Sequence, residues 1–365
     1  MNTYYLQIAT GLTISLVFSL LLIPCVIAVS MKFNLVDKPN ARKVHQQAIS
    51  RLGGIAIFLS ALAGTVISRT GLDAVRIWPV LFSSVALMFL LGVWDDLIEV
   101  NAKLRFIIQI CLAISLASTG IRLTSLYGIL GIHELNGPWQ YIVTVLIIVA
   151  STNAFNLIDG VDGLAAGLGL IGLLVLGSLA WRLRLYPLVI VLSACTGALL
   201  GFLKSNTSPA RIFMGDGGSL VLGFLLSAAG ILLIEEAHRF PRLVEPSKAA
   251  ILVTAILVIP VFDTWRVFAS RIRRGGSPFK ADKTHLHHLL LFAGLNHRKT
   301  AFSLYFFAIL LVLLALLMTN FKGVSIVILL MVGMSHVLTL ILRMNKGMEK
   351  WLAFIRKMEL GGDNL

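Results

Sequence analysis

The sequence contains little cysteine and little charge. Its 365 residues include only three cysteines, Cys25, Cys111 and Cys195, and each lies within an apolar run. No CxxC or Cys/His spacing predicts a zinc site, so we interpret the cysteines as small buried residues. Charged residues make up 13% of the chain and hydrophobic residues 58%, with a mean hydropathy of +0.91. This composition excludes a soluble globular domain and is typical of an integral membrane protein.

The sequence also lacks an internal repeat, a low-complexity segment and a Pro/Ser-rich linker. Apolar runs of about 17–25 residues recur instead, each close to the ~20 residues that a membrane-spanning helix needs. They cover residues 6–31, 53–69, 78–94, 105–121, 139–157, 161–180, 186–203, 217–234, 249–268, 301–319 and 324–342. No small-residue cleavage site follows the first run, so we expect a retained span rather than a signal peptide. The sequence therefore predicts a single all-α polytopic membrane domain over residues 1–365, with about eleven transmembrane helices.

Acidic residues are in the minority, with 17 Asp and Glu against 31 Lys and Arg and a net charge of +14. Such a charge could indicate nucleic-acid binding, but the basic residues are unevenly divided between alternate loops. The set that begins with the loop at residues 32–52 carries most of them. The positive-inside rule then places the amino terminus outside and the carboxyl terminus in the cytoplasm. We expect membrane lipids as partners and no nucleic acid.

Most of the acids on the predicted cytoplasmic side lie at the ends of separate spans. Asp95 and Asp96 follow the third run, Asp159 and Asp162 follow the fifth, and Asp216 precedes the eighth. Several segments therefore direct carboxylates to one membrane face, as the assembly of a site requires. The sequence predicts an active site at the cytoplasmic face.

One polar segment lies between two apolar runs. Its residues Asn153, Asn156 and Asp159 are three apart, which places them on one helix face over an arc of about 120°. A charged group at the bilayer centre costs roughly 2.5–3.5 kcal/mol, so an acid here indicates a function or a watery location. Gly160 and Gly163 can end the helix and let backbone approach a ligand. Such oxygen-rich groups suit a hard cation and a phosphate, although a polar network between helices is the alternative.

The acidic pair Asp95 and Asp96 precedes Glu99 and Lys103. Adjacent carboxylates repel each other, which raises a proton affinity or recruits a cation. A polar loop that merely ends a span is the alternative interpretation. Lys103 is either a phosphate ligand or part of the basic bias of this face.

A glycine-rich segment around Asp216 starts the eighth apolar run, directly after Phe213 and Met214. Backbone N–H groups at a helix amino terminus favour anions. Asp216 would repel a phosphate there unless a cation lies between them. A capping aspartate with turn glycines is the alternative.

The longest predicted cytoplasmic loop is basic and ends in three histidines, His285, His287 and His288. Imidazoles can bind a transition metal, transfer protons or donate hydrogen bonds to phosphate. No cysteine is nearby to complete a metal shell, so we favour phosphate or sugar contact. The basic residues alone are typical of a loop that faces lipid headgroups. Together, the carboxylates, amides, imidazoles and glycines indicate metal-assisted chemistry on a diphosphate at the membrane surface.

In this order and number, the motifs resemble those of the polyprenyl-phosphate N-acetylhexosamine-1-phosphate transferases, the glycosyltransferase 4 type. The resemblance covers essentially the whole chain. Leu286 interrupts the histidine run and Ser277-Pro278-Phe279 precedes it. Both features are similar to the bacterial branch that uses UDP-GlcNAc and undecaprenyl phosphate to start O-antigen, common-antigen or teichoic-acid linkage synthesis.

The resemblance implies a role for each candidate residue. It implies that Asn156 and Asp216 hold Mg²⁺, with Mn²⁺ as the alternative cofactor. It makes Asp95, Asp96 and Asp159 the catalytic group, with Asp95 as the base or the residue that orients the lipid phosphate. The implied substrate-binding residues are Lys103, Asn153, Asp162, Phe213, His285, His287 and His288.

Within that set, Asp162 and Phe213 match the family's uridine pocket, while Lys103 and the histidines would hold phosphate or sugar. One position departs from the family pattern, because the acidic motif often ends in Asp and here ends in Glu99. The longer side chain leaves Glu99 outside the implied catalytic group.

The implied reaction converts UDP-GlcNAc and undecaprenyl phosphate to undecaprenyl-diphospho-GlcNAc and UMP, in the bacterial inner membrane. We expect direct attack by the lipid phosphate rather than an aspartyl intermediate, because that phosphate is already an anionic nucleophile. A homodimer is a further expectation. Another UDP-HexNAc donor is the alternative within the enzyme class. A lipid or secondary transporter and a headgroup-binding scaffold are the alternatives outside it, although transport sites tend to lie near the midplane and in repeats.

Overall fold

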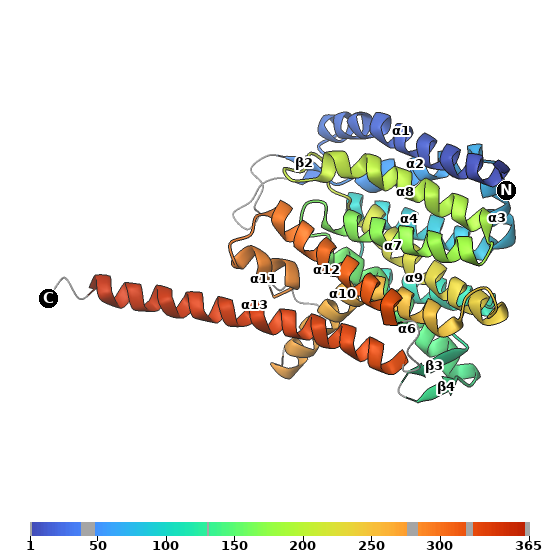
Figure 1. Cartoon of the computed structure of the whole chain (residues 1–365). Helices are drawn as coiled ribbons and strands as arrows, with labels where there is room; N and C mark the ends of the chain where they lie inside the picture. The colour runs from blue at the N-terminus through green and yellow to red at the C-terminus, as the bar shows by residue number, and fades with distance from the viewer. Residues whose placement is uncertain (1, 38–47, 130, 276–283, 319–323, 362–365) are drawn as a thin grey trace.

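The computed structural model of the chain consists almost entirely of α-helices (Figure 1). It describes residues 2–37, 48–129, 131–275, 284–318 and 324–361. The basic loop residues 276–283, which include Ser277-Pro278-Phe279, lie outside this description.

Nine helices in the described part of the chain are long and apolar enough to cross a bilayer, or ten if one bent pair counts as a span. The nine are α1 (Asn2–Lys32), α4 (Pro79–Ile98), α6 (Gly137–Ile158), α7 (Leu164–Arg182), α8 (Tyr186–Asn206), α9 (Asp216–Arg239), α10 (Pro246–Arg273), α12 (His297–Met318) and α13 (Val324–Gly361). The prediction of an all-α, multi-pass membrane protein is confirmed.

Each of the apolar runs forms a helix, but two of these helices are short. They are α2 (Gly53–Ile67), with 15 residues, and α5 (Ala102–Ser118), with 17. Both fall below the ~20 residues of a full span, and α2 forms the bent pair with α3 (Thr70–Ile77), at an angle of 107°. The number of eleven spans and the orientation of the termini therefore stay predictions.

Proline and asparagine residues mark where several helices begin. Pro79 and Pro246 lie in the first turns of α4 and α10, where a missing N–H group leaves no hydrogen bond unmade. Asn101 precedes α5, and its side chain accepts a hydrogen bond from the Lys103 N–H at 2.9 Å. These local signals set the ends of the helices that carry the candidate site.

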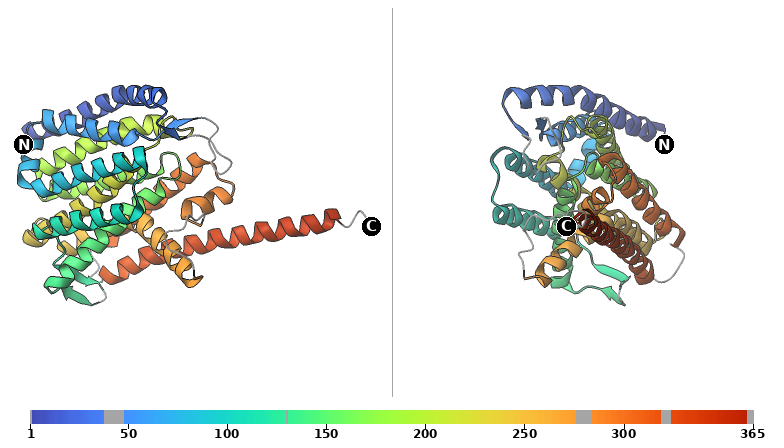
Figure 2. Two further views of the ribbon diagram at one scale, coloured as in Figure 1. Left: turned by 180° about the vertical axis from the view of Figure 1, so that it is seen from behind. Right: turned by 90° about the vertical axis from the view of Figure 1, so that its left-hand side faces the viewer.

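Helix α9 is the centre of the bundle and is buried along most of its length. It packs against α4, α6, α7 and α10, while α1 lies along α8 and α2 on one flank (Figures 1 and 2). Large apolar side chains are exposed on the peripheral helices α1, α12 and α13, as contact with lipid requires. Helix α13 runs past the rest of the molecule toward the carboxyl terminus (Figure 2).

The bundle has two ends, which α9 connects over roughly 36 Å at 1.5 Å per residue. We call the end at Asp95, Asp159 and Asp216 the site end. A short antiparallel strand pair, β1 (Val36–Asp37) and β2 (Ile49–Ser50), lies beside α9's first turn there.

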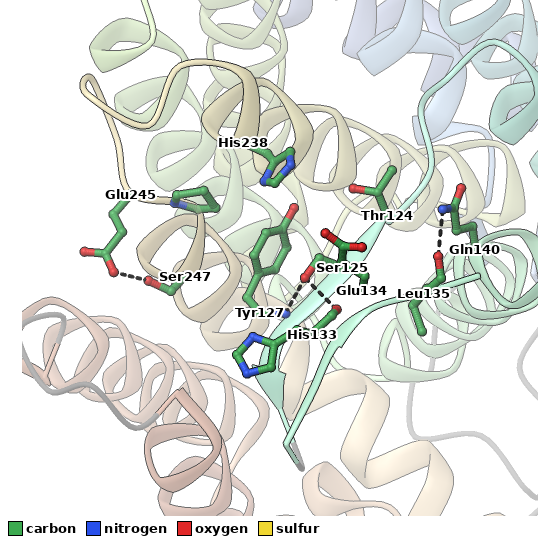
Figure 3. Close-up of a pocket in the computed structure, with 11 residues that line it drawn as sticks. Thr124, Ser125, Tyr127, His133, Glu134, Leu135, Gln140, His238, Glu245 and Ser247 are labelled. Carbon is green, nitrogen blue, oxygen red and sulfur yellow. Dashed lines mark hydrogen bonds between the residues drawn. The ribbon is translucent and has the colours of Figure 1, made fainter. Parts of the chain in front are cut away.

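The opposite end is the hairpin end. It consists of β3 (Ser125–Ile129), β4 (Ile132–Glu134) and the corner between α9 and α10. It holds a pocket of about 500 Å³ (Figure 3). The pocket is lined by Thr124, Ser125, Tyr127, His133, Glu134, Leu135, Gln140, His238, Glu245, Pro246 and Ser247. The candidate acids of the sequence analysis lie at the other end of α9.

Candidate active site

Asp96 holds the first turn of α9. Its carboxylate accepts hydrogen bonds from the backbone N–H groups of Asp216 at 2.8 Å and Gly217 at 2.9 Å. The chain reaches this turn through Gly215, whose φ of +71° favours glycine. Two of the N–H groups that the sequence predicts to bind an anion therefore already donate to Asp96. Asp96 lies on α4 and caps the amino terminus of α9.

Glycines allow the helices at the site end to meet backbone to backbone. A Cβ atom on Gly92 of α4 would lie 2.4 Å from the Asp216 carbonyl oxygen. A Cβ atom on Gly54 of α2 would lie 2.3 Å from the Gly218 nitrogen. Both separations are too short for any side chain, so the carboxylates at the end of α4 are held directly beside Asp216.

Arg105 links two of these carboxylates. Its Nη1 atom donates a hydrogen bond to Asp216 Oδ2 at 2.8 Å and another to Asp95 Oδ2. The Val100 N–H group donates to the other Asp95 oxygen at 2.6 Å. The sequence analysis missed Arg105, although a positive charge at the start of an apolar run was a usable signal. By contrast, Lys103 is exposed, and its side chain forms no ion pair with the residues described.

Asn156 joins the same group. Its amide nitrogen donates to Asp216 Oδ1 at 2.6 Å and to Ser219 Oγ at 3.0 Å. Asn153 lies one turn earlier, and its amide nitrogen donates to the Gln109 side chain at 2.6 Å and to the Val149 carbonyl. Asn153 is therefore tied to α5 through a buried glutamine that the sequence analysis did not identify.

Asp159 follows the last residue of α6 and lies among other carboxylates. Burial and the charges of Asp216, Asp96 and Asp162 raise its pKa well above the usual range. The positive charge beside this acidic group comes from Arg105, which Asp95 and Asp216 share, and from Arg51, whose charge acts on Asp96. The group thus has more negative charge than its protein partners neutralise.

The chemistry of this donor set fits a hard divalent cation. The ligand atoms on offer are carboxylate and amide oxygens, which Mg²⁺ prefers. As the side chains stand, no three His, Cys, Asp or Glu groups in the described part of the chain are spaced to hold a metal ion. Arg105 lies between Asp95 and Asp216 and supplies the positive charge there.

Asp162 and Phe213, the expected uridine pocket, both lie at the site end. Burial alone would raise the pKa of Asp162. A hydrogen bond and the charge from His297, together with a hydrogen bond from the Ala210 N–H, outweigh burial and hold the pKa below its usual value. Asp162 Oδ1 lies 3.3 Å from His297 Nδ1. The backbone of Phe213 is bonded to Ser50 and Gly53 beside the first turn of α9. His297, the first residue of α12, was not identified from the sequence.

Two of the three histidines are buried. His287 is 1% exposed and lies over Gly160, where a Cβ atom would be 3.1 Å from its Nε2 atom. Burial, with a further contribution from the His288 charge, lowers the pKa of His287 to about 3, so its ring is neutral at physiological pH. The ring centroids of His287 and His288 are 4.2 Å apart. His285 is 5% exposed, and its Nδ1 atom lies 2.8 Å from Asp263 Oδ2.

Comparison with known proteins agrees with this arrangement. The model of glycosyl transferase family 4 matches residues 78–234, the segment that contains the candidate carboxylates from Asp95 to Asp216. A probable undecaprenyl-phosphate N-acetylglucosaminyl 1-phosphate transferase of Bacillus subtilis is 35% identical over 308 residues, or 82% of each chain.

Two further relatives cover similar shares. The undecaprenyl-phosphate alpha-N-acetylglucosaminyl 1-phosphate transferase of Escherichia coli is 32% identical over 301 residues, 80% of this chain and 79% of the relative. The decaprenyl-phosphate N-acetylglucosaminephosphotransferase of Mycolicibacterium smegmatis is 32% identical over 303 residues, 76% of this chain and 73% of the relative. On its sequence, its helical membrane fold and the carboxylates gathered at one end of α9, the chain belongs to glycosyl transferase family 4.

Proposed function

We propose that the chain transfers GlcNAc-1-phosphate from UDP-GlcNAc to undecaprenyl phosphate, giving undecaprenyl-diphospho-GlcNAc and UMP. The observation that carries the proposal is the cluster of Asp95, Asp96, Asp159 and Asp216 at one end of the bundle, where Arg105 joins Asp95 to Asp216. The names of the relatives supply the sugar and the lipid.

In the proposed reaction an oxygen of the lipid phosphate attacks the β-phosphorus of UDP-GlcNAc. The bond from that phosphorus to the bridging oxygen breaks, and the electron pair leaves with UMP. Asp95, which is held by Arg105 and the Val100 N–H, would orient the lipid phosphate. Asp96 fixes the first turn of α9 and so sets the position of Asp216. Transfer is direct in this scheme, without an aspartyl intermediate.

Asn156 and Asp216 are the residues that would hold Mg²⁺, or Mn²⁺ as the alternative. When bound, the cation would neutralise charge on the diphosphate and on the departing UMP. Asn156 and Asp216 already lie side by side, 2.6 Å apart at their polar atoms. Arg105 meanwhile provides a fixed positive charge that Asp216 shares with Asp95.

The remaining candidates surround this group and would bind UDP-GlcNAc. Asp162 and Phe213 would contact the uridine. His287 is neutral, and its Nδ1 atom has no hydrogen-bond partner among the described residues. A neutral imidazole can donate one hydrogen bond to a phosphate or sugar oxygen. We assign the same role to His288 and Lys103.

We infer that the protein lies in the bacterial inner membrane with the site end in the cytoplasm, where nucleotide sugars are made. The amino terminus would be outside and the carboxyl terminus inside, following the positive-inside rule. The product would start a cell-envelope polysaccharide: O-antigen, common antigen or a teichoic-acid linkage unit. A homodimer remains part of the proposal.

The test is release of UMP from UDP-GlcNAc by the purified protein, with and without undecaprenyl phosphate and Mg²⁺. Release that needs both supports the reaction and the cofactor. Decaprenyl phosphate as the acceptor tests how strictly the lipid is selected, because one relative is named for that carrier. Turnover only with another UDP-HexNAc would retain the chemistry and change the sugar. Folded protein that is inactive with every nucleotide sugar would favour the transporter alternative.

A further inference from the structure

Helix α10 carries two buried charged residues near its site end that the proposed chemistry does not use. Asp263 is 2% exposed and Arg266 is 6% exposed. Burying an ion pair costs several kcal/mol per ion unless hydrogen bonds compensate. The pair therefore needs a structural or functional explanation, which its contacts provide.

The contacts connect α10 to residues 284–286. Asp263 Oδ1 accepts hydrogen bonds from Arg266 Nη2 at 2.6 Å and from the Leu286 N–H at 3.0 Å. Asp263 Oδ2 lies 2.8 Å from His285 Nδ1. The same Arg266 nitrogen donates to the Thr284 carbonyl at 2.6 Å. Two side chains one turn apart on α10 thus bind three consecutive residues of a segment about 20 positions later in the sequence.

That segment begins α11 (Leu286–Phe292), which has only seven residues. So short a helix is not stable in isolation, and the N–H groups of its first turn have no partner within the helix. His285, its N-cap residue, makes no capping hydrogen bond to α11 with its own side chain. Asp263 supplies the missing acceptor from another helix. Asp263 therefore helps to fix the start of α11, which also packs against α12 and α13.

We propose that Asp263 and Arg266 form a clasp that positions the histidine segment against the active site. His287 lies two residues beyond the clasped His285 and over Gly160, directly after Asp159. His285 stacks on His287 with ring centroids 5.7 Å apart. The clasp is a positioning device, because neither Asp263 nor Arg266 belongs to the group proposed to contact the substrates.

The clasp predicts a particular kinetic change in Asp263→Asn. The variant keeps the size of the side chain but loses the charge and presents an NH₂ group to one of its donors. We expect the KM for UDP-GlcNAc to rise about 10- to 100-fold, as for outer partners that orient ligands, with a smaller change in kcat. This part rests on the proposed role of His287 and His288 in donor binding.

A second measurement tests the clasp without activity. In the purified full-length protein, diethyl pyrocarbonate should leave His285 and His287 largely unmodified, since they are 5% and 1% exposed. Exposed His133 and His238 are internal positive controls. In Asp263→Asn we expect mass spectrometry to show modification of His285 and His287 at least several-fold faster, with the modification of His133 unchanged.

The matched control is Glu236→Gln at the hairpin end. Glu236 is also a buried carboxylate bonded to an arginine three residues later, at 2.8 Å, but it binds no second segment among the residues that the structure describes. It should change neither KM nor histidine protection. Arg266→Lys keeps the charge and should expose the histidines less than Asp263→Asn does. It is the variant to test if Asp263→Asn does not fold.

The outcomes separate the clasp from the proposed function. Histidines that stay protected in both folded variants overturn the clasp, whatever happens to KM. Histidines that become exposed while the KM for UDP-GlcNAc is unchanged support the clasp and remove the proposed role of the histidines in donor binding.

Discussion

Helix α9 carries carboxylates at both of its ends, and their surroundings differ. At the hairpin end, Glu235 accepts hydrogen bonds from the Thr124 backbone and hydroxyl at 3.0 and 2.9 Å and from the Tyr127 hydroxyl at 3.3 Å (Figure 3 shows Thr124 and Tyr127). At the site end, Asp216 shares one Arg105 nitrogen with Asp95 and lies close to Asp96.

The comparison sets a carboxylate that stabilises the fold beside acids that we propose are arranged for chemistry. Donors reach both oxygens of Glu235 and both oxygens of Asp216, so the two ends differ in the charges nearby rather than in hydrogen bonding. Burial and the Glu235 charge raise the pKa of Tyr127, which keeps its hydroxyl a donor. The acids at the site end repel one another, which lowers stability, as is common where ionisable groups are arranged for function. The pocket lies at the hairpin end.

The sharpest test of this contrast is Asp216→Asn. It removes a proposed metal ligand, so we expect UMP release to fall by about 10²- to 10³-fold, the scale of losing one main electrostatic group. The melting temperature should change little, because the removal of a repelling charge offsets the cost of an amide NH₂ group that faces the Arg105 or Asn156 donor. Turnover within a few-fold of the unsubstituted protein would refute the metal assignment.

Replacing Arg105 should have the next largest effect. Arg105→Gln removes the charge that holds Asp95 beside Asp216, and we expect an activity loss of about 10- to 100-fold. Arg105→Lys should retain most of the activity, since a single nitrogen makes both contacts. Equal activity in the glutamine and lysine variants would show that the charge of Arg105 is not needed. UMP release at saturating substrate is the measurement.

At the hairpin end, Glu235→Gln should lower stability and leave turnover unchanged, which is the opposite of the result expected for Asp216→Asn. The amide NH₂ group would face the Thr124 donors, so we expect a loss of about 1–3 kcal/mol in unfolding free energy with kcat unchanged. Thermal unfolding in detergent and UMP release, measured on one preparation, test both expectations. A loss of turnover with unchanged stability would contradict the structural role.

The smallest expected effect is a pH-dependent change in melting temperature in Asp159→Asn. Because the folded protein raises the pKa of Asp159, its ionised form destabilises the fold above the ordinary Asp pKa of about 3.9. The stability that the protonated form provides is complete below that pKa and is lost as the pH rises through the raised pKa. Asp159→Asn should therefore raise the melting temperature at pH 8, with a gain that disappears toward pH 4. A gain that is the same at both pH values would argue against repulsion.

Much of the fold follows from the sequence, because each apolar run long enough to contact lipid must satisfy its backbone by forming a helix. The gathering of Asp95, Asp159 and Asp216 also follows, since acids at helix ends on one side of a membrane are confined to one plane. The residues that bind these acids cannot be predicted from the sequence. Arg105 and His297 are assigned by contacts between distant segments, which no local pattern encodes.

The strands of the hairpin end were missed for a related reason. β3 and β4 are five and three residues long and lie between two apolar runs. So short a hairpin is marginal on its own, and the Glu235 side chain of α9 stabilises it. Asp263 lies within the apolar run 249–268, but its role depends on residues 284–286, which only folding brings beside it.

The glycine contacts between α4 and α9 work as a mechanical stop. With Gly92 against the Asp216 backbone, the two helices are already as close as main-chain atoms allow. The gap between the carboxylates of α4 and those of α9 can therefore widen but not shrink. Any side chain at position 92 would act as a spacer. Alanine and then serine there would move Asp95 away from Asp216 in small steps, and so would show how close the two carboxylates must lie to share Arg105, without altering any of the three groups.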